Sequence, residues 1–483
     1  MSSKRNIFRS LVALAGGNAG AQAIGMVRLV ILARLLDKTE FGIAAAFSLT
    51  ASLLEMLSDT GADRQIVQAP DGNRPRMQAT LHLMQATRGL GLGVLMFALA
   101  GPLATLANAP QSLWAFQLLA LAPVLSGLKH LDFARVQRRL KFMPSVHVAL
   151  AGQLLATLIS VPLAWYTRSH TAMLWAVLGQ MGGMSLASFL VARRPFRFAW
   201  DREILKRALA FSLPLMGSGI LLAAIFHGDR LFVMGFYPPE QLADYTVALQ
   251  IATVPALVAT KVVASLSLPV LASVVKDEAK FRQRYSSVLQ GVGGMCVAYA
   301  AGLLLAGPAV LWVFGSEYLS ALALLGVVTV RSAIRMLRVA PNQAAMSAGD
   351  TINMLICNVV RVAFVAPAAL FAAWKWPIVW IAAVGLAGEV AAMATAAVML
   401  RLSLKKPLRL TLAPTLEVFA LLALAAAPLL LPGESLWLTA LKAAASLAAL
   451  AIGVWLVDTR LNLGFAKRLR GNRAVPAAGN PVG

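Results

Sequence analysis

Long apolar stretches alternate with short polar segments from one end of the chain to the other. A helix of about twenty apolar residues is long enough to cross the hydrocarbon core of a bilayer. The pattern predicts spans near residues 10–36, 40–65, 77–106, 112–136, 143–166, 171–192, 207–236, 241–272, 285–313, 318–347, 352–373, 377–400, 412–431 and 436–457. The predicted fold class is therefore all-α, a polytopic membrane protein with about fourteen transmembrane helices.

A basic stretch, RRPFRFAWDREILKR, divides the first twelve spans into two blocks of six. The predicted organisation is an N-terminal six-helix lobe (1–192), a cytoplasmic basic linker (193–206), a C-terminal six-helix lobe (207–400), two additional spans (401–458) and a polar cytoplasmic tail (459–483).

Composition supports the membrane interpretation. Hydrophobic residues make up 59% of the chain and charged residues only 13%, with a mean hydropathy of +0.74. A soluble helical bundle needs a polar face on each helix at the 3.6-residue period, and those faces are missing. The alternative of a large soluble bundle is therefore rejected.

The formal charge of +23 raises the question of nucleic-acid binding. The basic residues instead occupy short blocks between apolar runs, which is the pattern of the positive-inside rule. Basic residues precede the first span (Lys4, Arg5) and follow the last (Lys467, Arg468), so both termini are predicted to be cytoplasmic in a bacterial inner membrane. We expect no nucleic-acid partner.

Metal and cofactor chemistry is not predicted. The two cysteines, Cys296 and Cys357, both lie within apolar runs and form neither a disulfide framework nor a metal-ligand spacing. We expect no cofactor, no metal and no catalytic residue, so the chain is not predicted to be an enzyme.

The two blocks of six begin alike. MVRLVILARLL at the end of the first span can be aligned with GDRLFVMGFYP at the end of the seventh, which pairs Arg28 with Arg230. Six helices separate the two copies, so they share one orientation in the membrane and form a parallel repeat. Substrate would then bind between the lobes, unless the likeness is chance similarity of two apolar helices.

Three segments carry a resemblance to a known family. ARLLDKTEFGIAAAF, LSDTGADRQIVQ and DRLFVMGFYPPEQLADY resemble the polysaccharide transporters, the Wzx-type flippases of the multidrug/oligosaccharidyl-lipid/polysaccharide superfamily. The resemblance implies two bundles that open alternately around a cationic central cavity. It also implies that the last two spans help to form a groove for a lipid tail.

Positive side chains within the predicted spans are the candidate substrate ligands. Arginine suits a pyrophosphate because its planar fork donates paired hydrogen bonds. The predicted substrate-binding residues are Arg28, Arg230, Lys261, Arg331 and Arg88. The alternative for each is an ion pair between helices or a side chain that reaches the membrane surface.

Other arginines in the spans have structural interpretations. Arg331, Arg335 and Arg338 share one helix face, and we interpret Arg335 and Arg338 as interfacial topology signals. Arg361 and Glu389 lie at similar depth and can neutralise each other.

Acidic side chains supply the candidate coupling-ion site. Glu55, Asp59 and Asp63 are four residues apart and share one face of the second span, and Asp229 precedes Arg230. The candidate coupling residues are Glu55, Asp59 and Asp229. The alternative is that Asp59 and Gly61 shape the end of a helix, and that Asp229 pairs with Arg230.

The predicted function is translocation of a lipid-linked (polyprenyl-pyrophosphate) oligosaccharide from the cytoplasmic to the periplasmic leaflet, by alternating access, for exopolysaccharide, capsule or O-antigen synthesis. One alternative is a cation-coupled multidrug exporter of the same superfamily, and another is a membrane polysaccharide polymerase or ligase. Expected partners are the lipid-linked oligosaccharide, membrane lipids, and the polymerase and export components of the same pathway.

Overall fold

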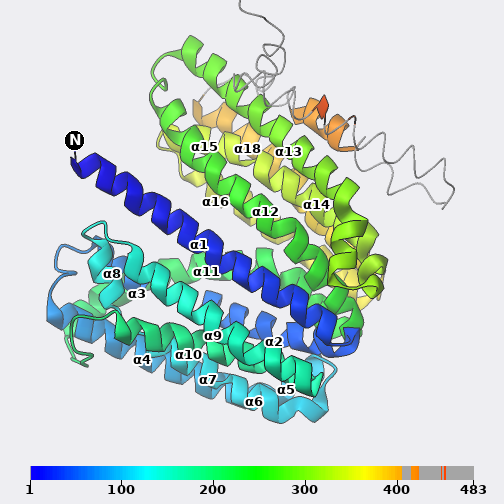
Figure 1. The fold of residues 1–483 in the computed structure, drawn as a ribbon. Coiled ribbons are helices and arrows are strands. Elements are labelled where there is room, and N and C mark those ends of the chain that lie inside the picture. Colours follow the sequence, from blue (N-terminus) through cyan, green and yellow to red (C-terminus); the bar gives the residue numbers. More distant parts are fainter. Residues whose placement is uncertain (1, 405–414, 424–447, 449–450, 453–483) are drawn as a thin grey trace, which may run out of the picture. The chain divides into compact units, whose positions relative to one another are not determined.

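The computed structural model describes residues 2–404, 415–423, 448 and 451–452 (Figure 1), and their secondary structure is helical. Most of the two predicted spans near 412–431 and 436–457, and all of the tail 459–483, lie outside the described residues. The chain is divided into two compact units. The predicted lobe boundaries at residues 192 and 207 remain predictions.

Unit 1 comprises residues 1–247 with the short segments 312–318 and 368–378. Its elements are α1 (Ser2–Leu35), α2 (Lys38–Leu57), α3 (Ala62–Gln68), α4 (Pro75–Ala98), α5 (Ala100–Leu106), η1 (Pro110–Ser112), α6 (Leu113–Leu119), α7 (Leu121–Gly127), α8 (Asp132–Gln137), α9 (Met143–Thr167), α10 (Thr171–Leu190), α11 (Arg202–Phe236) and the start of α12 (Pro239–Ala272).

Unit 2 holds the remainder of α12 and most of the chain that follows it. The elements after α12 are α13 (Glu278–Phe314), η2 (Ser316–Ala321), α14 (Leu322–Leu337), α15 (Val339–Ser347), α16 (Ile352–Ala363), α17 (Val365–Ala373) and α18 (Ile378–Leu404). The end of α13, the first half of η2 and most of α17 belong to unit 1.

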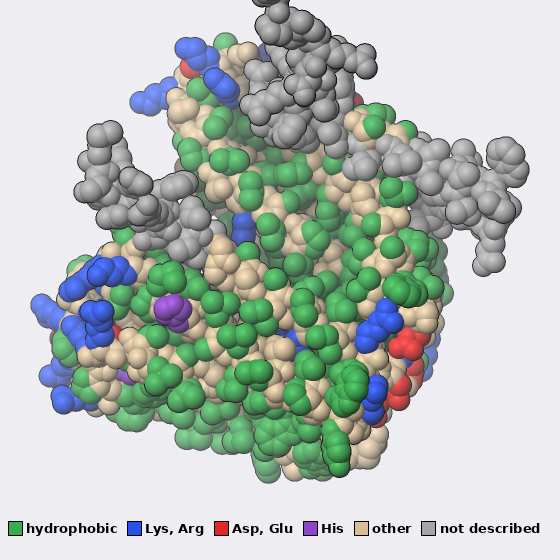
Figure 2. Space-filling model, in the orientation of Figure 1, with side chains coloured by type: hydrophobic (Ala, Val, Ile, Leu, Met, Phe, Trp, Pro, Cys, Tyr) green, Lys and Arg blue, Asp and Glu red, His purple; other side chains and the backbone are tan. Residues whose placement is uncertain are grey.

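The chain is a multi-pass membrane protein by the length and polarity of its helices. Within the described residues, nine helical stretches are long and apolar enough to cross a bilayer. A tenth is added if α4 and α5 form one span, although they meet at a bend of 58°. The apolar flank of unit 1 around α4 to α7 is covered by hydrophobic side chains in Figure 2, as expected for a surface that contacts lipid.

The span predicted near 112–136 is not a single helix. It is divided into η1, α6, α7 and α8, with a break at Ala120. Pro123 has no N–H to donate to the carbonyl of Leu119, four residues earlier, so the regular helical bonding is interrupted at this point. The α8 segment follows a second break at residues 128–131.

Aspartate side chains cap the N-termini of two helices of unit 1, α2 and α11. The Asp37 carboxylate accepts a hydrogen bond from the Glu40 amide at 2.8 Å at the start of α2. The Asp201 carboxylate accepts from the amides of Glu203 and Ile204 at 3.1 and 3.2 Å at the start of α11. These bonds satisfy amides that the first turn of a helix leaves without partners.

Small residues let α4 and α7 pack closely in unit 1. A Cβ atom placed on Gly89 would lie 2.6 Å from the Pro123 carbonyl oxygen and 2.9 Å from the Gly127 Cα atom. Only glycine permits that approach, which is a recurrent way of packing helices in membranes. The contact brings α4 and α7 together around the pocket described below.

Candidate functional site

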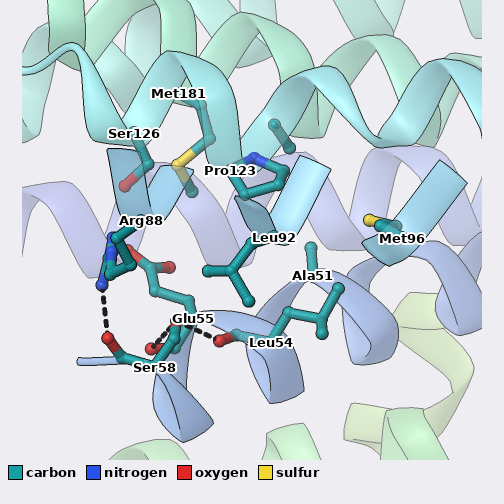
Figure 3. Close-up of a pocket in the computed structure, with 11 residues that line it drawn as sticks. Ala51, Leu54, Glu55, Ser58, Arg88, Leu92, Met96, Pro123, Ser126 and Met181 are labelled. Carbon is teal, nitrogen blue, oxygen red and sulfur yellow. Dashed lines mark hydrogen bonds between the residues drawn. The ribbon is translucent and has the colours of Figure 1, made fainter. Parts of the chain in front are cut away.

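A small pocket lies inside unit 1 between α2, α4, α7 and α10 (Figure 3). Its volume of about 20 Å³ is enough for about one water molecule. Most of the lining is apolar, and Glu55, Ser58, Arg88 and Ser126 are the polar side chains among the lining residues. The predicted substrate ligand Arg88 and the predicted coupling residue Glu55 therefore lie in one pocket.

Arg88 donates a hydrogen bond at the C-terminal end of α2. Its Nη1 donates a hydrogen bond to the Ser58 carbonyl oxygen at 2.7 Å, and Ser58 is the residue at which α2 ends. A guanidinium at this position meets the negative end of the helix dipole and one of the carbonyls that the helix leaves unbonded. Its buried Nε has no hydrogen-bond partner among the described atoms, so the group retains donor capacity.

Glu55 and Asp59, two acidic residues of the second predicted span, have different surroundings. Glu55 lines the pocket, whereas the Asp59 carboxylate accepts from the Gly61 amide at 2.9 Å and pairs with Arg64 at 3.0 Å. Gly61 has a φ of +60°, which favours glycine at the turn between α2 and α3. This geometry agrees with the alternative in which Asp59 shapes the helix end, and its coupling role remains a prediction.

Arg28 lies on α1 and contacts two neighbouring helices. Its Nη1 donates to the Gln153 carbonyl oxygen on α9, and its Nη2 to the Gln180 Oε1 atom on α10, both at 3.5 Å. Both acceptors are uncharged amides, so these bonds orient the guanidinium without neutralising it.

Arg230 and Asp229 are adjacent in α11 but have different partners. The Arg230 Nη2 atom lies 2.7 Å from the Nδ1 atom of His227, one turn earlier on the same helix. The Asp229 carboxylate accepts from the Tyr245 hydroxyl of α12 at 3.0 Å, within unit 1. His227 was missed in the sequence, although its spacing of three residues before Arg230 is the signal that predicts a contact.

Unit 2 contains a buried cluster of arginines around one carboxylate. Glu389, with 1% of its side chain exposed, lies 2.8 Å from Arg335 Nε, 3.4 Å from Arg338 Nη2 and 2.5 Å from Arg361 Nη2. The predicted pairing of Arg361 with Glu389 is confirmed. We name Glu389 and these three arginines the Glu389 cluster.

The interpretation of Arg335 and Arg338 as interfacial topology signals was wrong. Both guanidinium groups contact the buried Glu389 of α18, and Arg338 is itself buried. A buried charge is tolerated when it is paired and hydrogen-bonded, so the helix face that carries them turns toward α18.

The remaining two predicted ligands differ in burial. Arg331 is 6% exposed, and a Cβ atom on Gly385 of α18 would lie 2.6 Å from its Cζ atom. Lys261 on α12 is exposed. Arg331 therefore lies on the same side of α14 as the Glu389 cluster, as its spacing predicts, whereas Lys261 does not join a described polar contact.

Groups suited to a metal are not found in the described part of the chain, where no three His, Cys, Asp or Glu side chains lie close enough to hold an ion. The site chemistry in the described residues is that of guanidinium groups, which bind phosphate and carboxylate oxygens.

Comparison with known proteins identifies relatives of this chain. Residues 31–323 match the family model described as "Polysaccharide biosynthesis protein". The succinoglycan biosynthesis transport protein ExoT of Rhizobium meliloti is 24% identical over 322 residues, which cover 65% of this chain and 64% of that protein. The lipopolysaccharide biosynthesis protein WzxC of Escherichia coli is 23% identical over 358 residues, with coverages of 70% and 67%.

Two solved structures share the fold. The lipid II flippase MurJ in an inward closed conformation matches with a TM-score of 0.67 at 13% identity, over 95% of this chain and all of that chain. An inward-facing multidrug resistance MATE family transporter matches with a TM-score of 0.54 at 18% identity, over 81% and 94% of the two chains. At these identities the likeness shows the fold alone.

Proposed function

The chain belongs to the polysaccharide biosynthesis protein family of Wzx-like transporters in the multidrug/oligosaccharidyl-lipid/polysaccharide superfamily, and from this premise we propose that it flips a lipid-linked oligosaccharide across the membrane. The family is one of transporters rather than enzymes. The proposed substrate is a polyprenyl-pyrophosphate oligosaccharide, which moves from the cytoplasmic to the periplasmic leaflet of a bacterial inner membrane by alternating access.

The finer architecture is part of the proposal. It consists of fourteen spans, arranged as two six-helix bundles and a C-terminal pair, with both termini in the cytoplasm. The substrate would bind between the bundles, and the polymerase and export components of the same pathway would be its partners. The relatives named for succinoglycan and lipopolysaccharide synthesis support the pathway class.

The observation that carries the proposal is the excess of guanidinium groups over carboxylates within the apolar helices. In unit 2 three arginines share Glu389, and in unit 1 Arg88 bonds a carbonyl oxygen rather than a carboxylate. Each centred charge costs roughly 2.5 to 3.5 kcal/mol on insertion scales, so arginines persist in a span where they bind partners or a ligand. A pyrophosphate presents the oxygens that such groups recognise.

Arg88 is the best residue for testing substrate binding, because its described contact with the rest of the protein is one hydrogen bond, to the Ser58 carbonyl oxygen. We expect the Arg88→Gln variant to flip labelled lipid-linked oligosaccharide on the order of tenfold more slowly in inverted membrane vesicles, because a charge-assisted bond contributes about 1.5 to 3 kcal/mol. Arg88→Lys should retain an intermediate rate, since it keeps the charge but loses the paired donors.

The matched control is Arg282→Gln, which removes an exposed arginine whose partner is Glu278. We expect the control to flip substrate at the unmodified rate. Equal rates for Arg88→Gln and the control would argue against Arg88 as a ligand. A gene deletion that changes drug resistance, without accumulation of lipid-linked oligosaccharide on the cytoplasmic side, would contradict the flippase and favour the multidrug exporter.

A further inference from the structure

The extended linker between α10 and α11, residues 191–201, covers the beginning of α4. The Ala199 amide donates to the Ala79 carbonyl oxygen at 3.4 Å. The Phe196 ring stacks on the His82 ring with 4.3 Å between centroids, and His82 Nδ1 lies 3.3 Å from the Arg197 carbonyl oxygen. The linker is therefore held along the first two turns of α4.

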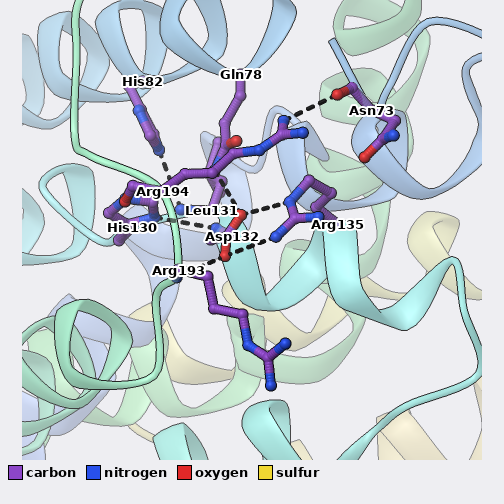
Figure 4. A network of polar contacts seen from close by, with 9 residues as sticks. All are labelled: Asn73, Gln78, His82, His130, Leu131, Asp132, Arg135, Arg193 and Arg194. Atoms are coloured by element: carbon purple, nitrogen blue, oxygen red, sulfur yellow. Dashed lines mark hydrogen bonds and ion pairs between the residues drawn. The ribbon is translucent and has the colours of Figure 1, made fainter. Parts of the chain in front are cut away.

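The inner side of the linker is fixed by a polar network (Figure 4). The Arg193 amide donates to Asp132 Oδ2 at 2.9 Å, and this fully buried carboxylate is also bonded by Arg135 at 2.5 and 3.0 Å. Arg194 donates from Nη1 to the Asn73 carbonyl oxygen at 2.8 Å, and its own carbonyl oxygen lies 2.9 Å from His130 Nε2. These contacts fix the position of the linker and thereby determine what its outer side presents.

The outer side carries aromatic and basic side chains. Phe198 is 54% exposed and Trp200 is 71% exposed. We define the basic-aromatic strip as the exposed residues Arg193, Arg197, Phe198, Trp200, Arg202 and Lys206. Residues 193–206 contain two acids, Asp201 and Glu203. Asp201 pairs with Arg76 at 2.7 Å, so Glu203 is the one exposed acid of this segment without that compensation. The strip is therefore strongly cationic.

The linker covers the first turns of a face of α4 that is exposed farther along the helix. Leu90 is 60% exposed, as expected for a side chain in contact with hydrocarbon. Ala79 lies eleven residues earlier, which is about three helical turns, so it shares the face of Leu90. Ala79 is nevertheless buried, because the linker covers it. The outer side of the linker thus continues the lipid-facing surface of α4 toward the polar end of unit 1, where Lys and Arg side chains gather near α3 and α8 (Figure 2).

We propose that the basic-aromatic strip docks onto the anionic phospholipid headgroups of the adjacent leaflet. Tryptophan rings at the level of the headgroups anchor a membrane protein, and phenylalanine is common on the apolar side of interfacial segments. Each nearby Lys or Arg contributes about 1 kcal/mol on an anionic surface. The linker is already ordered by the network beneath it, so docking costs little conformational entropy. The strip holds the chain segment between α10 and α11 at the membrane surface, whatever substrate is transported.

A spin label at position 200 tests this proposal in the full-length chain. The variant Trp200→Cys, with Cys296→Ala and Cys357→Ala, is reconstituted into phosphatidylcholine vesicles with or without phosphatidylglycerol. We expect collision of the label with a water-soluble nickel chelate to be on the order of fivefold lower in the vesicles with phosphatidylglycerol, the ratio that about 1 kcal/mol provides.

Two controls separate docking of the strip from general attraction to anionic lipid. Arg193→Gln with Arg197→Gln and Arg202→Gln should remove the phosphatidylglycerol effect, whereas Lys280→Gln with Arg282→Gln and Arg284→Gln, which removes as many exposed charges from the start of α13, should preserve it. Unchanged thermal unfolding of both variants confirms that they fold. Two results would overturn the proposal. In the first, the label at position 200 is as accessible to the nickel chelate as a label at Asp277→Cys in both kinds of vesicle. In the second, the label at position 200 is equally shielded with and without phosphatidylglycerol.

Discussion

At the scale of single residues, Glu389 is the side chain on which unit 2 depends most. Its carboxylate contacts Arg335, Arg338 and Arg361, and it is almost fully buried. Removal of one partner of a buried ion pair leaves an uncompensated charge, which typically costs 3 to 5 kcal/mol. The Glu389 cluster therefore holds α14, α16 and α18 together only while the carboxylate is present.

We expect Glu389→Gln to destabilise the protein by about 3 kcal/mol or more, because three guanidinium groups, of which those of Arg338 and Arg361 are buried, lose their shared anion. Thermal unfolding in detergent measures the effect. The matched control is Glu278→Gln, whose exposed pair with Arg282 spans 3.8 Å and should contribute about 0 to 1 kcal/mol. Equal melting temperatures of the two variants would contradict the structural role of the Glu389 cluster.

Helix contacts give predictions at the scale of elements. A methyl group on Gly89 would overlap the backbone of α7 at Pro123 and Gly127, and backbone atoms cannot move aside as a flexible side chain can. We expect Gly89→Ala to lower the stability by about 1 to 3 kcal/mol, as overpacking does. Gly91→Ala, where a methyl group meets open space on the same helix, should cause no loss; equal losses would show that the α4–α7 contact is not tight.

His130, which contacts the linker, gives a second prediction at this scale, because the hydrogen bond that its Nδ1 atom accepts depends on a neutral imidazole. His130 Nδ1 accepts from the Asp132 amide at 3.1 Å, and Nε2 donates to the Arg194 carbonyl oxygen at 2.9 Å, so a proton on Nδ1 breaks the first bond and leaves the second in place. Burial lowers the pKa of His130. The hydrogen bond to the Arg194 carbonyl oxygen and the charge of Asp132 favour its protonation, and Arg135 opposes it.

A histidine whose pKa is lowered by folding stabilises the fold while it is neutral. That stability is lost as the pH falls below about 6.5, the ordinary value in the unfolded chain. We expect the amide-exchange protection of Asp132, corrected for its intrinsic exchange rate, to fall between about pH 7 and pH 5, because its amide loses the Nδ1 acceptor. His130→Gln should weaken this pH dependence, and the exposed His147→Gln should not; the same pH profile in all three proteins would contradict the prediction.

At the scale of the whole molecule, the charge of the proposed substrate predicts a driving force. Outward movement of an anion across an inside-negative membrane gains about 2.3 kcal/mol per charge per 100 mV. A pyrophosphate group carries more than one such charge, so the membrane potential alone favours export. This expectation rests on the proposed function.

We therefore expect dissipation of the potential, at constant pH and sodium gradients, to slow flipping of labelled substrate several-fold in vesicles. The control is an equal collapse of the sodium gradient at constant potential, which should leave the rate unchanged. A rate that follows the ion gradient and ignores the potential would instead favour coupling through carboxylates such as Glu55.

Several features followed from the sequence alone because they depend on local pattern. Apolar runs longer than a bilayer crossing identify a multi-pass membrane protein whatever the arrangement of its helices. The segments that begin at Ala33, Leu57 and Asp229 resemble the family that the comparison then identified. The pairing of Arg361 with Glu389 was also predictable, since two opposite charges at similar depth in neighbouring spans have few other ways to avoid hydrocarbon.

Other features were decided only by the tertiary structure, because the rotation of each helix about its axis depends on its neighbours. The sequence suggested that Arg335 and Arg338 lie at the membrane surface, but packing against α18 turns them onto Glu389. The contact of Arg88 with the end of α2 joins residues thirty positions apart, and a carbonyl acceptor carries no signal in the sequence. Likewise, the sequence predicted a basic linker, and its inner contacts with Asp132 and His82 showed which of its side chains face outward.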